Sequence, residues 1–225
     1  MKKLSVVIAQ TGRQVYEQIL KVLGYSLICS LVLAPMLLFM NIGLAVICFL
    51  LLLFPLLSGV FYACHLQLSG EMVTVRHIVE GLRKFYVRSV AFGLFLTLFI
   101  LILLSSWWYY GDQGNTLHFT IAVFQTYFVI MALISQLYTM LLIYREQLSI
   151  FQAMGKSVKL FLRYPLYTVG AFLQALCLIF ILAVTVVGFL GLFFGMFGYY
   201  LNLLTANVLK ESEPQHDVKP IPAEG

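Results

Sequence analysis

Charged side chains are scarce in this chain. Of its 225 residues only 10% are Asp, Glu, Lys or Arg, whereas 62% are hydrophobic, and the mean hydropathy is +0.97. Soluble domains carry about 25% charged residues, so this composition excludes a globular core with a hydrated surface. It is the composition of an integral membrane protein.

The residue patterns of common catalytic and metal sites are also missing. All four cysteines lie inside apolar stretches and are expected to be buried small hydrophobes, not disulfides or metal ligands: Cys29, Cys48, Cys64 and Cys177. The four histidines show no H-x-x-x-H pair, and no acid pair or acid–histidine pair falls within an apolar segment. The net charge of +5 is assigned to cytoplasmic loops and lipid contact. We therefore expect no enzyme, cofactor, metal or nucleic-acid partner.

The few cations are distributed in a way that predicts topology. The fourteen Lys and Arg residues fall into four groups: 2, 3, 13 and 21; 76, 83, 84 and 88; 145, 156, 159 and 163; 210 and 219. The apolar stretches between the groups are each long enough for two spans of about 20 residues. All cations lie on one side of a membrane only if every stretch crosses it twice. The sequence thus predicts an all-α protein with six transmembrane helices in three hairpins and, by the positive-inside bias, both termini in the cytoplasm.

Turn-forming residues divide each apolar stretch. Asn41–Gly43, Gly111–Asn115 and Gly188–Gly191 are the expected outer turns. The predicted spans are 22–40, 43–68, 87–109, 117–143, 165–187 and 191–209, and Arg88, at the start of 87–109, is the only Asp, Glu, Lys or Arg within them. Residues 1–21 form an expected N-terminal amphipathic cytoplasmic segment, and the polar, proline-containing tail 210–225 is predicted to be disordered.

Short amphipathic helices are predicted on the inner leaflet, in residues 1–21 and in the connectors 69–86 and 144–164. The basis is apolar residues at helical spacing between basic ones. The expected apolar stripes are Leu4, Ile8, Val15 and Ile19; Val75, Ile78, Val79 and Leu82; and Phe151, Met154, Val158 and Phe161.

One stretch resembles a known group of proteins. It comprises Pro55-Leu56-Leu57-Ser58-Gly59, Ala63-Cys64, Gly70-Glu71 and His77-Ile78-Val79-Glu80-Gly81-Leu82-Arg83. Residues 55–88 resemble uncharacterised bacterial multi-pass inner-membrane proteins, in which a helix ending P-x-x-x-G leads through a G-E turn into a segment ending G-[FL]-R. The layout is also similar to YesL-type and YciC-type membrane proteins. The resemblance implies a bacterial inner-membrane location and supplies no active site. Locally, Gly59 is expected to allow close helix approach, Gly70 to turn the chain and Gly81 to face a neighbour.

Polar residues at one depth form a candidate layer. Gln136, Gln174 and Asn202 lie about 8–11 residues from the basic ends of their helices, or roughly 12–16 Å into the membrane, and Tyr199 shares a helix face with Asn202. Two interpretations stay open: hydrogen bonding between helices, or a ligand or conduction site. Separate partners for the amides favour the first, and a common cavity favours the second.

Glycines and cations supply two further sets of candidate residues. A helix-packing face is predicted from the spacing of Gly188, Gly191, Gly195 and Gly198. The connector cations either bind anionic headgroups or an acidic partner, or serve only to fix topology: Arg76, Arg83, Lys84, Arg88, Lys156, Lys159 and Arg163.

The function predicted from these features is non-enzymatic. We expect a structural, regulatory or accessory component of the bacterial inner membrane, with its working surface in the cytoplasm because little of the chain protrudes outward. Membrane lipids are the expected partners, and a membrane or cytoplasmic protein partner or a homo-oligomer is compatible with this composition. The alternative is a small oligomeric transporter or channel that uses the polar layer.

Overall fold

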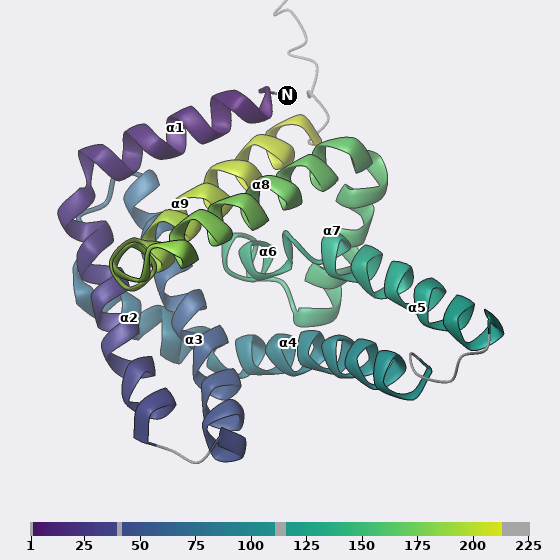
Figure 1. Cartoon of the computed structure of the whole chain (residues 1–225). Coiled ribbons are helices and arrows are strands. Elements are labelled where there is room, and N and C mark those ends of the chain that lie inside the picture. The colour runs from purple at the N-terminus through teal and green to yellow at the C-terminus, as the bar shows by residue number, and fades with distance from the viewer. Residues whose placement is uncertain (1, 40–41, 111–115, 213–225) are drawn as a thin grey trace, which may run out of the picture.

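The protein is helical throughout its described part. A computed structural model describes residues 2–39, 42–110 and 116–212 (Figure 1). These ranges contain helices and no strand: α1 (Leu4–Glu17), α2 (Ile19–Phe39), α3 (Ile42–Leu68), α4 (Val75–Tyr110), α5 (Thr116–Ser135), α6 (Thr139–Arg145), α7 (Ile150–Arg163), α8 (Pro165–Val184) and α9 (Val186–Ser212). The expected all-α class is confirmed.

Several helical segments are long and apolar enough to cross a membrane. Five qualify among the described residues: Leu51–Leu68, Val75–Tyr110, Thr116–Arg145, Pro165–Val184 and Gly188–Ser212. A sixth is counted if α1 and the start of α2, which meet at a bend of 88°, form one broken span. The chain therefore has the helices of a multi-pass membrane protein. Five or six of them could cross the membrane, and six is the expected number.

Two predicted boundaries in the first connector and the last hairpin are wrong. The connector helix expected within 69–86 is not separate, because α4 runs without a break from Val75 through the span to Tyr110; residues 82–88 contain no Gly or Pro that would stop it. The last turn lies at Thr185, not at Gly188–Gly191. Thr185 is extended, its hydroxyl donates to Leu182 O at 3.3 Å, and the glycines continue into α9.

The expected span 117–143 is interrupted near its C-terminal end. α5 stops at Ser135 and α6 starts at Thr139. Ser157 of α7 provides side-chain hydrogen bonds across this break: its hydroxyl donates to Ser135 O at 2.6 Å and accepts from Tyr138 N at 3.3 Å. The expected breaks at 40–43 and 111–115 include residues outside the described ranges. Most of the tail 210–225 also lies outside these ranges.

Glycines set the closest helix contacts. A Cβ at Gly195 would lie 3.0 Å from Val22 Cα in α2, and one at Gly198 would lie 2.9 Å from Cys64 Sγ in α3. A Cβ at Gly191 would be 3.3 Å from Leu23. Gly188 differs from these three, because the nearest atom to its Cβ position belongs to Thr185, at the junction before its own helix. The α9 face that includes Gly191, Gly195 and Gly198 thus packs against α2 and α3.

The glycines of residues 55–88 also have local structural roles. A Cβ at Gly59 would lie 2.5 Å from Ile78 O of α4, and one at Gly81 would lie 2.8 Å from Tyr62 of α3. Gly70 has a φ of +88° immediately after α3, a conformation that L side chains rarely adopt. The close approach of α3 and α4 therefore depends on small residues on both helices.

The surface helices present faces that differ from the expected stripes. α1 buries Val7, Thr11 and Val15, whereas Ile8 and Ile19 are exposed. α7 buries Ala153, Ser157, Leu160 and Phe161, and its Phe151 is 82% exposed. The alternation of apolar and polar residues predicted an amphipathic helix at both places, but it did not show which apolar residues face the protein.

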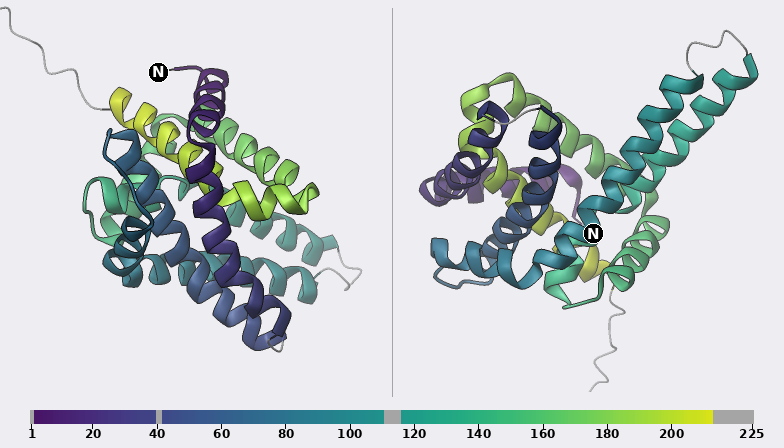
Figure 2. Two further views of the ribbon diagram at one scale, coloured as in Figure 1. Left: turned by 90° about the vertical axis from the view of Figure 1, so that its left-hand side faces the viewer. Right: turned by 90° about the horizontal axis from the view of Figure 1, so that it is seen from below.

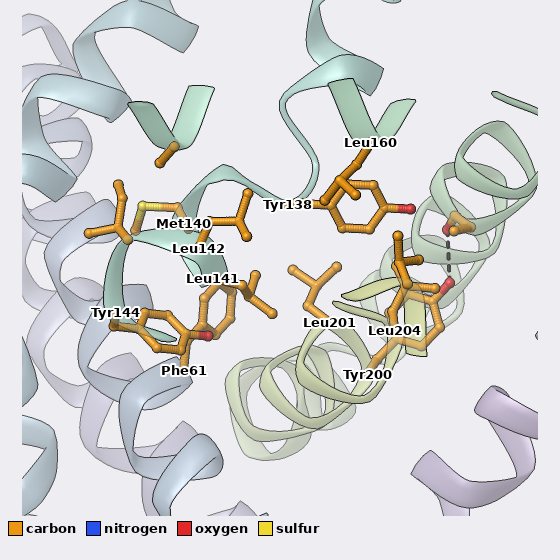
Figure 3. Close-up of a cluster of buried hydrophobic side chains, with 14 of the residues drawn as sticks. Phe61, Tyr138, Met140, Leu141, Leu142, Tyr144, Leu160, Tyr200, Leu201 and Leu204 are labelled. Carbon is orange, nitrogen blue, oxygen red and sulfur yellow. Dashed lines mark hydrogen bonds between the residues drawn. The ribbon is translucent and has the colours of Figure 1, made fainter. Parts of the chain in front are cut away.

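The buried core surrounds α6 and α9. All residues from Thr139 to Tyr144 are buried, and Figure 3 shows Leu141 between Phe61 of α3 and Leu201 of α9. By contrast, α4 and α5 extend together from this core as an arm (Figure 2, right). In that view the end of α4, the start of α5, the facing ends of α2 and α3 and the α8–α9 junction lie toward one end of the molecule, and the C-terminus of α9 lies toward the other.

Candidate functional site: a polar cluster against α9

One face of α9 carries buried polar side chains. Tyr199, Asn202 and Thr205 are each 0% exposed, and their spacing of three places them one above the other on the helix. Buried polar atoms in an apolar interior are costly unless they are hydrogen-bonded. This face, with the side chains that touch it, is therefore the strongest candidate site among the described residues.

Asn202 connects three helices. Its Nδ2 donates to Phe61 O of α3 at 3.1 Å and to Gly198 O of its own helix at 2.9 Å. Its Oδ1 accepts from Tyr144 OH and from Arg145 Nη2, both at 3.4 Å. Arg145 Nη2 also donates to Asn202 O at 3.0 Å. The amide thus holds α3, α6 and α9 together and fixes one edge of a guanidinium.

Arg145 is a cation without a carboxylate partner in the described part of the chain. Its neighbour Glu146 is bound instead by Lys156 Nζ, 2.6 Å from Oε1. Arg145 is half-buried, and its Nε is buried with no hydrogen-bond partner. The sequence placed this residue in the polar connector 144–164, outside the predicted span 117–143, whereas the apolar helical segment Thr116–Arg145 ends on it.

Aromatic rings surround Tyr144 beside this cation. Its ring centroid lies 5.9 Å from that of His65, 6.1 Å from Phe85 and 6.5 Å from Tyr62. The ammonium of Lys84 stands 5.8 Å from the centre of the Tyr62 ring and 5.4 Å from that of Phe85, within the range of cation–π attraction. The rings therefore connect the Arg145 site to the basic surface of α4.

Unsatisfied polar atoms are concentrated at the same place. Five buried side-chain atoms have no hydrogen-bond partner in the described residues: Ser106 Oγ, His118 Nδ1, Arg145 Nε, Tyr199 OH and Thr205 Oγ1. The first two belong to the α4–α5 arm. Tyr199 OH and Thr205 Oγ1 belong to the polar face of α9, and Arg145 contacts that face. Buried polar atoms without partners are rare in folded proteins, so their concentration here distinguishes this region.

The other amides of the predicted polar layer have partners of their own. Gln136 Nε2 donates to Ser135 Oγ at 3.2 Å, and its Oε1 accepts from Thr139 Oγ1 at 2.8 Å. Gln174 Oε1 accepts from Tyr200 OH at 3.2 Å, and this hydroxyl also donates to Ala171 O at 2.9 Å (Figure 3). Across the described ranges no hydrogen bond joins Gln136, Gln174 and Asn202 to one another.

The cavities also place Gln136 and Gln174 in different surroundings. Gln136 lines an apolar cavity of about 260 Å³ together with residues of α3, α4, α8 and α9. Gln174 lines a different one of about 330 Å³, whose walls come from α1, α8 and α9. Neither cavity is lined by Asn202. The three amides at one predicted depth therefore belong to three separate environments.

The connector cations also differ in their environments. Arg76, Arg83 and Lys84 line a surface hollow of about 550 Å³ along α4. Arg88 Nη1 donates to Leu148 O at 3.3 Å, and Arg163 Nη1 donates to Ser212 O at 3.1 Å. Lys156 is paired with Glu146, and Lys159 is exposed. Four of the seven predicted cations are thus exposed or line the open hollow, whereas Arg88, Lys156 and Arg163 are tied to neighbouring segments.

Arg145 had no sequence signal of its own. It follows Tyr144 at the end of an apolar run, as expected for a topological cation, and only the contact with Asn202, 57 positions away, gives it a second role. Within the described residues no group of three His, Cys, Asp or Glu side chains could hold a metal ion. No protein-family model, curated protein or solved structure matches the chain.

Proposed function

We propose that this chain is a non-enzymatic structural, regulatory or accessory protein of the bacterial inner membrane. The observation that supports this proposal best is the separate pairing of Gln136, Gln174 and Asn202. Polar side chains that line a conduction path would share a cavity, whereas these join neighbouring helices, as polar groups between membrane helices commonly do. The same observation speaks against the small transporter or channel.

The proposed topology has three helical hairpins with both termini in the cytoplasm. The grouping of cations supports it, and so does the position of the helix ends at one side of the molecule in Figure 2. Apolar side chains on the arm, such as Phe124 and Phe128, are 72% and 60% exposed. This exposure suits contact with lipid and would be unfavourable in water.

The proposed working surface is the cytoplasmic one. α7 has a buried face toward the protein and an outer face that includes Phe151 and Leu162, which are 82% and 68% exposed. A helix with apolar residues on its outer face and cations beside them suits the boundary between headgroups and acyl chains. Lys159 and the cations of the α4 hollow would then meet anionic headgroups, each contributing about 1 kcal/mol.

Topology and transport are tested separately. A reporter fused after Gly225 is expected to be cytoplasmic, and one inserted at Gly114 to be periplasmic. The purified protein in planar bilayers is expected to give no ion conductance above the protein-free bilayer. Conductance that Gln136→Leu or Gln174→Leu abolishes, with unchanged melting in detergent, would instead support the channel. A periplasmic C-terminus would overturn the proposed orientation.

A further inference from the structure

We propose that the Arg145 guanidinium is the centre of an oxyanion-binding site that takes a phosphate group. The phosphate belongs either to a lipid headgroup or to free inorganic phosphate. The site lies where α6 ends against α9. It deepens the proposed function by naming a ligand class, and it rests on that function only for the side of the membrane from which the ligand arrives.

The guanidinium is held in place by the protein before any ligand arrives. Nη2 is fixed by two acceptors of Asn202, the backbone oxygen at 3.0 Å and Oδ1 at 3.4 Å. Asn202 is itself fixed by Phe61 O and Gly198 O. An oriented guanidinium gives up little side-chain freedom on binding, and its planar fork matches the oxygens of a phosphate. The anchor thus favours binding and leaves other donors of the group unengaged.

No carboxylate of the described residues forms an ion pair with Arg145. Glu146, the adjacent carboxylate, is engaged by Lys156. The remaining ionisable neighbours on the packed elements are His65 of α3, Tyr144 of α6 and, beyond the aromatic rings, Lys84 of α4. None of these three supplies a negative charge near neutral pH. An anion is therefore the ligand whose charge complements the site.

The donors of the site also lack acceptors. Arg145 Nε is buried without a partner, and Thr205, one helical step from Asn202, has a buried hydroxyl without one. Nη1 makes no hydrogen bond with a described residue, although Arg145 is only half-buried. An oxyanion that enters beside this half-buried group can accept from Nη1, because the Nε–H points to the side of Nη2 and away from Nη1. A neutral apolar ligand would give Nη1 no acceptor.

Thermal melting of the full chain in neutral detergent tests the site without requiring a known orientation. The probes are a short-chain phosphatidylglycerol, a short-chain phosphatidylcholine and inorganic phosphate, each titrated against the wild type, Arg145→Gln and Arg145→Lys. The matched control is Arg88→Gln, because Arg88 is also a half-buried arginine that donates to a backbone carbonyl. Arg145→Lys keeps the charge and loses the fork, and it serves in place of Arg145→Gln if that variant does not fold.

We expect phosphatidylglycerol to raise the melting temperature of the wild type and of Arg88→Gln by similar amounts, and to raise that of the Arg145 variants by less than half as much. A saturable shift with inorganic phosphate that disappears in the same variants would assign the site to free phosphate. A shift with the lipid alone would assign it to a headgroup. Equal shifts in the wild type and both Arg145 variants would overturn the proposal. Equal losses in Arg88→Gln and Arg145→Gln would overturn it too, because they would indicate a diffuse basic surface. None of these results depends on whether the protein conducts ions.

Discussion

Helix α9 and the α4–α5 arm are both apolar enough to cross a membrane, but they are buried in opposite ways. In the apolar part of α9, 56% of the residues are buried within the protein. In the apolar parts of α4 and of α5 with α6, only 17% are buried. α9 also carries the close-packed glycines and the buried polar face, and the arm carries exposed Leu, Phe and Trp side chains. Hydropathy reports the tendency to leave water. It does not distinguish a helix that contacts protein from one that contacts lipid.

The largest expected difference between the two regions is in aromatic truncation. Phe61 of α3 is 2% exposed and packs against Phe197 of α9. The variant Phe61→Ala should therefore reduce the stability of the protein by about 3–5 kcal/mol. Phe124→Ala on the arm should lose less than about 0.5 kcal/mol, because lipid or detergent replaces its contacts. Thermal melting in detergent compares the two variants, and equal losses would show that the arm is buried by protein.

Helix approach gives the next largest effect. Gly195→Ala should destabilise the protein by about 1–3 kcal/mol, because the new methyl group would lie 3.0 Å from both Val22 Cα and Val22 O. The control is Gly24→Ala in α2, where nothing lies within 4 Å of the new atom. That variant should be neutral or more stable by up to about 1 kcal/mol from helix propensity. If Gly195→Ala melts at the wild-type temperature, α2 and α9 are not closely packed in the membrane.

Replacement of a polar residue should also cost more stability in α9 than in the arm. Asn202→Leu should cost about 1–3 kcal/mol, because it leaves Phe61 O and Tyr144 OH without their partner inside the bundle. Gln125→Leu on the arm should change stability by less than about 0.5 kcal/mol, since Gln125 is only partly buried and makes no hydrogen bond with a described side chain. Chemical denaturation in mixed micelles measures both, and a greater loss for Gln125→Leu would reverse the comparison.

The smallest effect is expected at an ion pair outside both regions. Lys156→Gln removes the pair with Glu146, whose side chains are 39% and 29% exposed. We expect a loss of roughly 0.2–1 kcal/mol that shrinks as salt is added. The Arg13–Glu17 pair, at 79% and 42% exposure, is the comparison, and Arg13→Gln should cost no more than Lys156→Gln. A loss at Lys156 that salt does not change would point to packing of its alkyl chain.

Much of the helical layout could be predicted from the sequence, because apolar length and helix-breaking residues are local properties. The regions of α2, α3, α8 and α9 were placed correctly, although the turn before α9 was not, since Gly188 and Gly191 lie within a helix and the chain turns at Thr185. The break after Ser135 could not be seen, because it depends on Ser157, 22 residues away in sequence. The candidate site was found only in part: Asn202 and Tyr199 were identified by depth and face, but Arg145 becomes a site residue only through a contact with another helix.

The bend of 88° after α1 has a consequence for the order in which the protein is assembled. It turns α1 so that the backbone of Lys2 forms hydrogen bonds with Asn207, with its nitrogen 3.0 Å from Oδ1 and its oxygen 3.1 Å from Nδ2. α1 therefore docks on α9, at a residue 205 positions further along the chain. α1 and α2 must wait until α9 has been synthesised, and during that delay their apolar faces are available to insertion factors and to quality-control proteases.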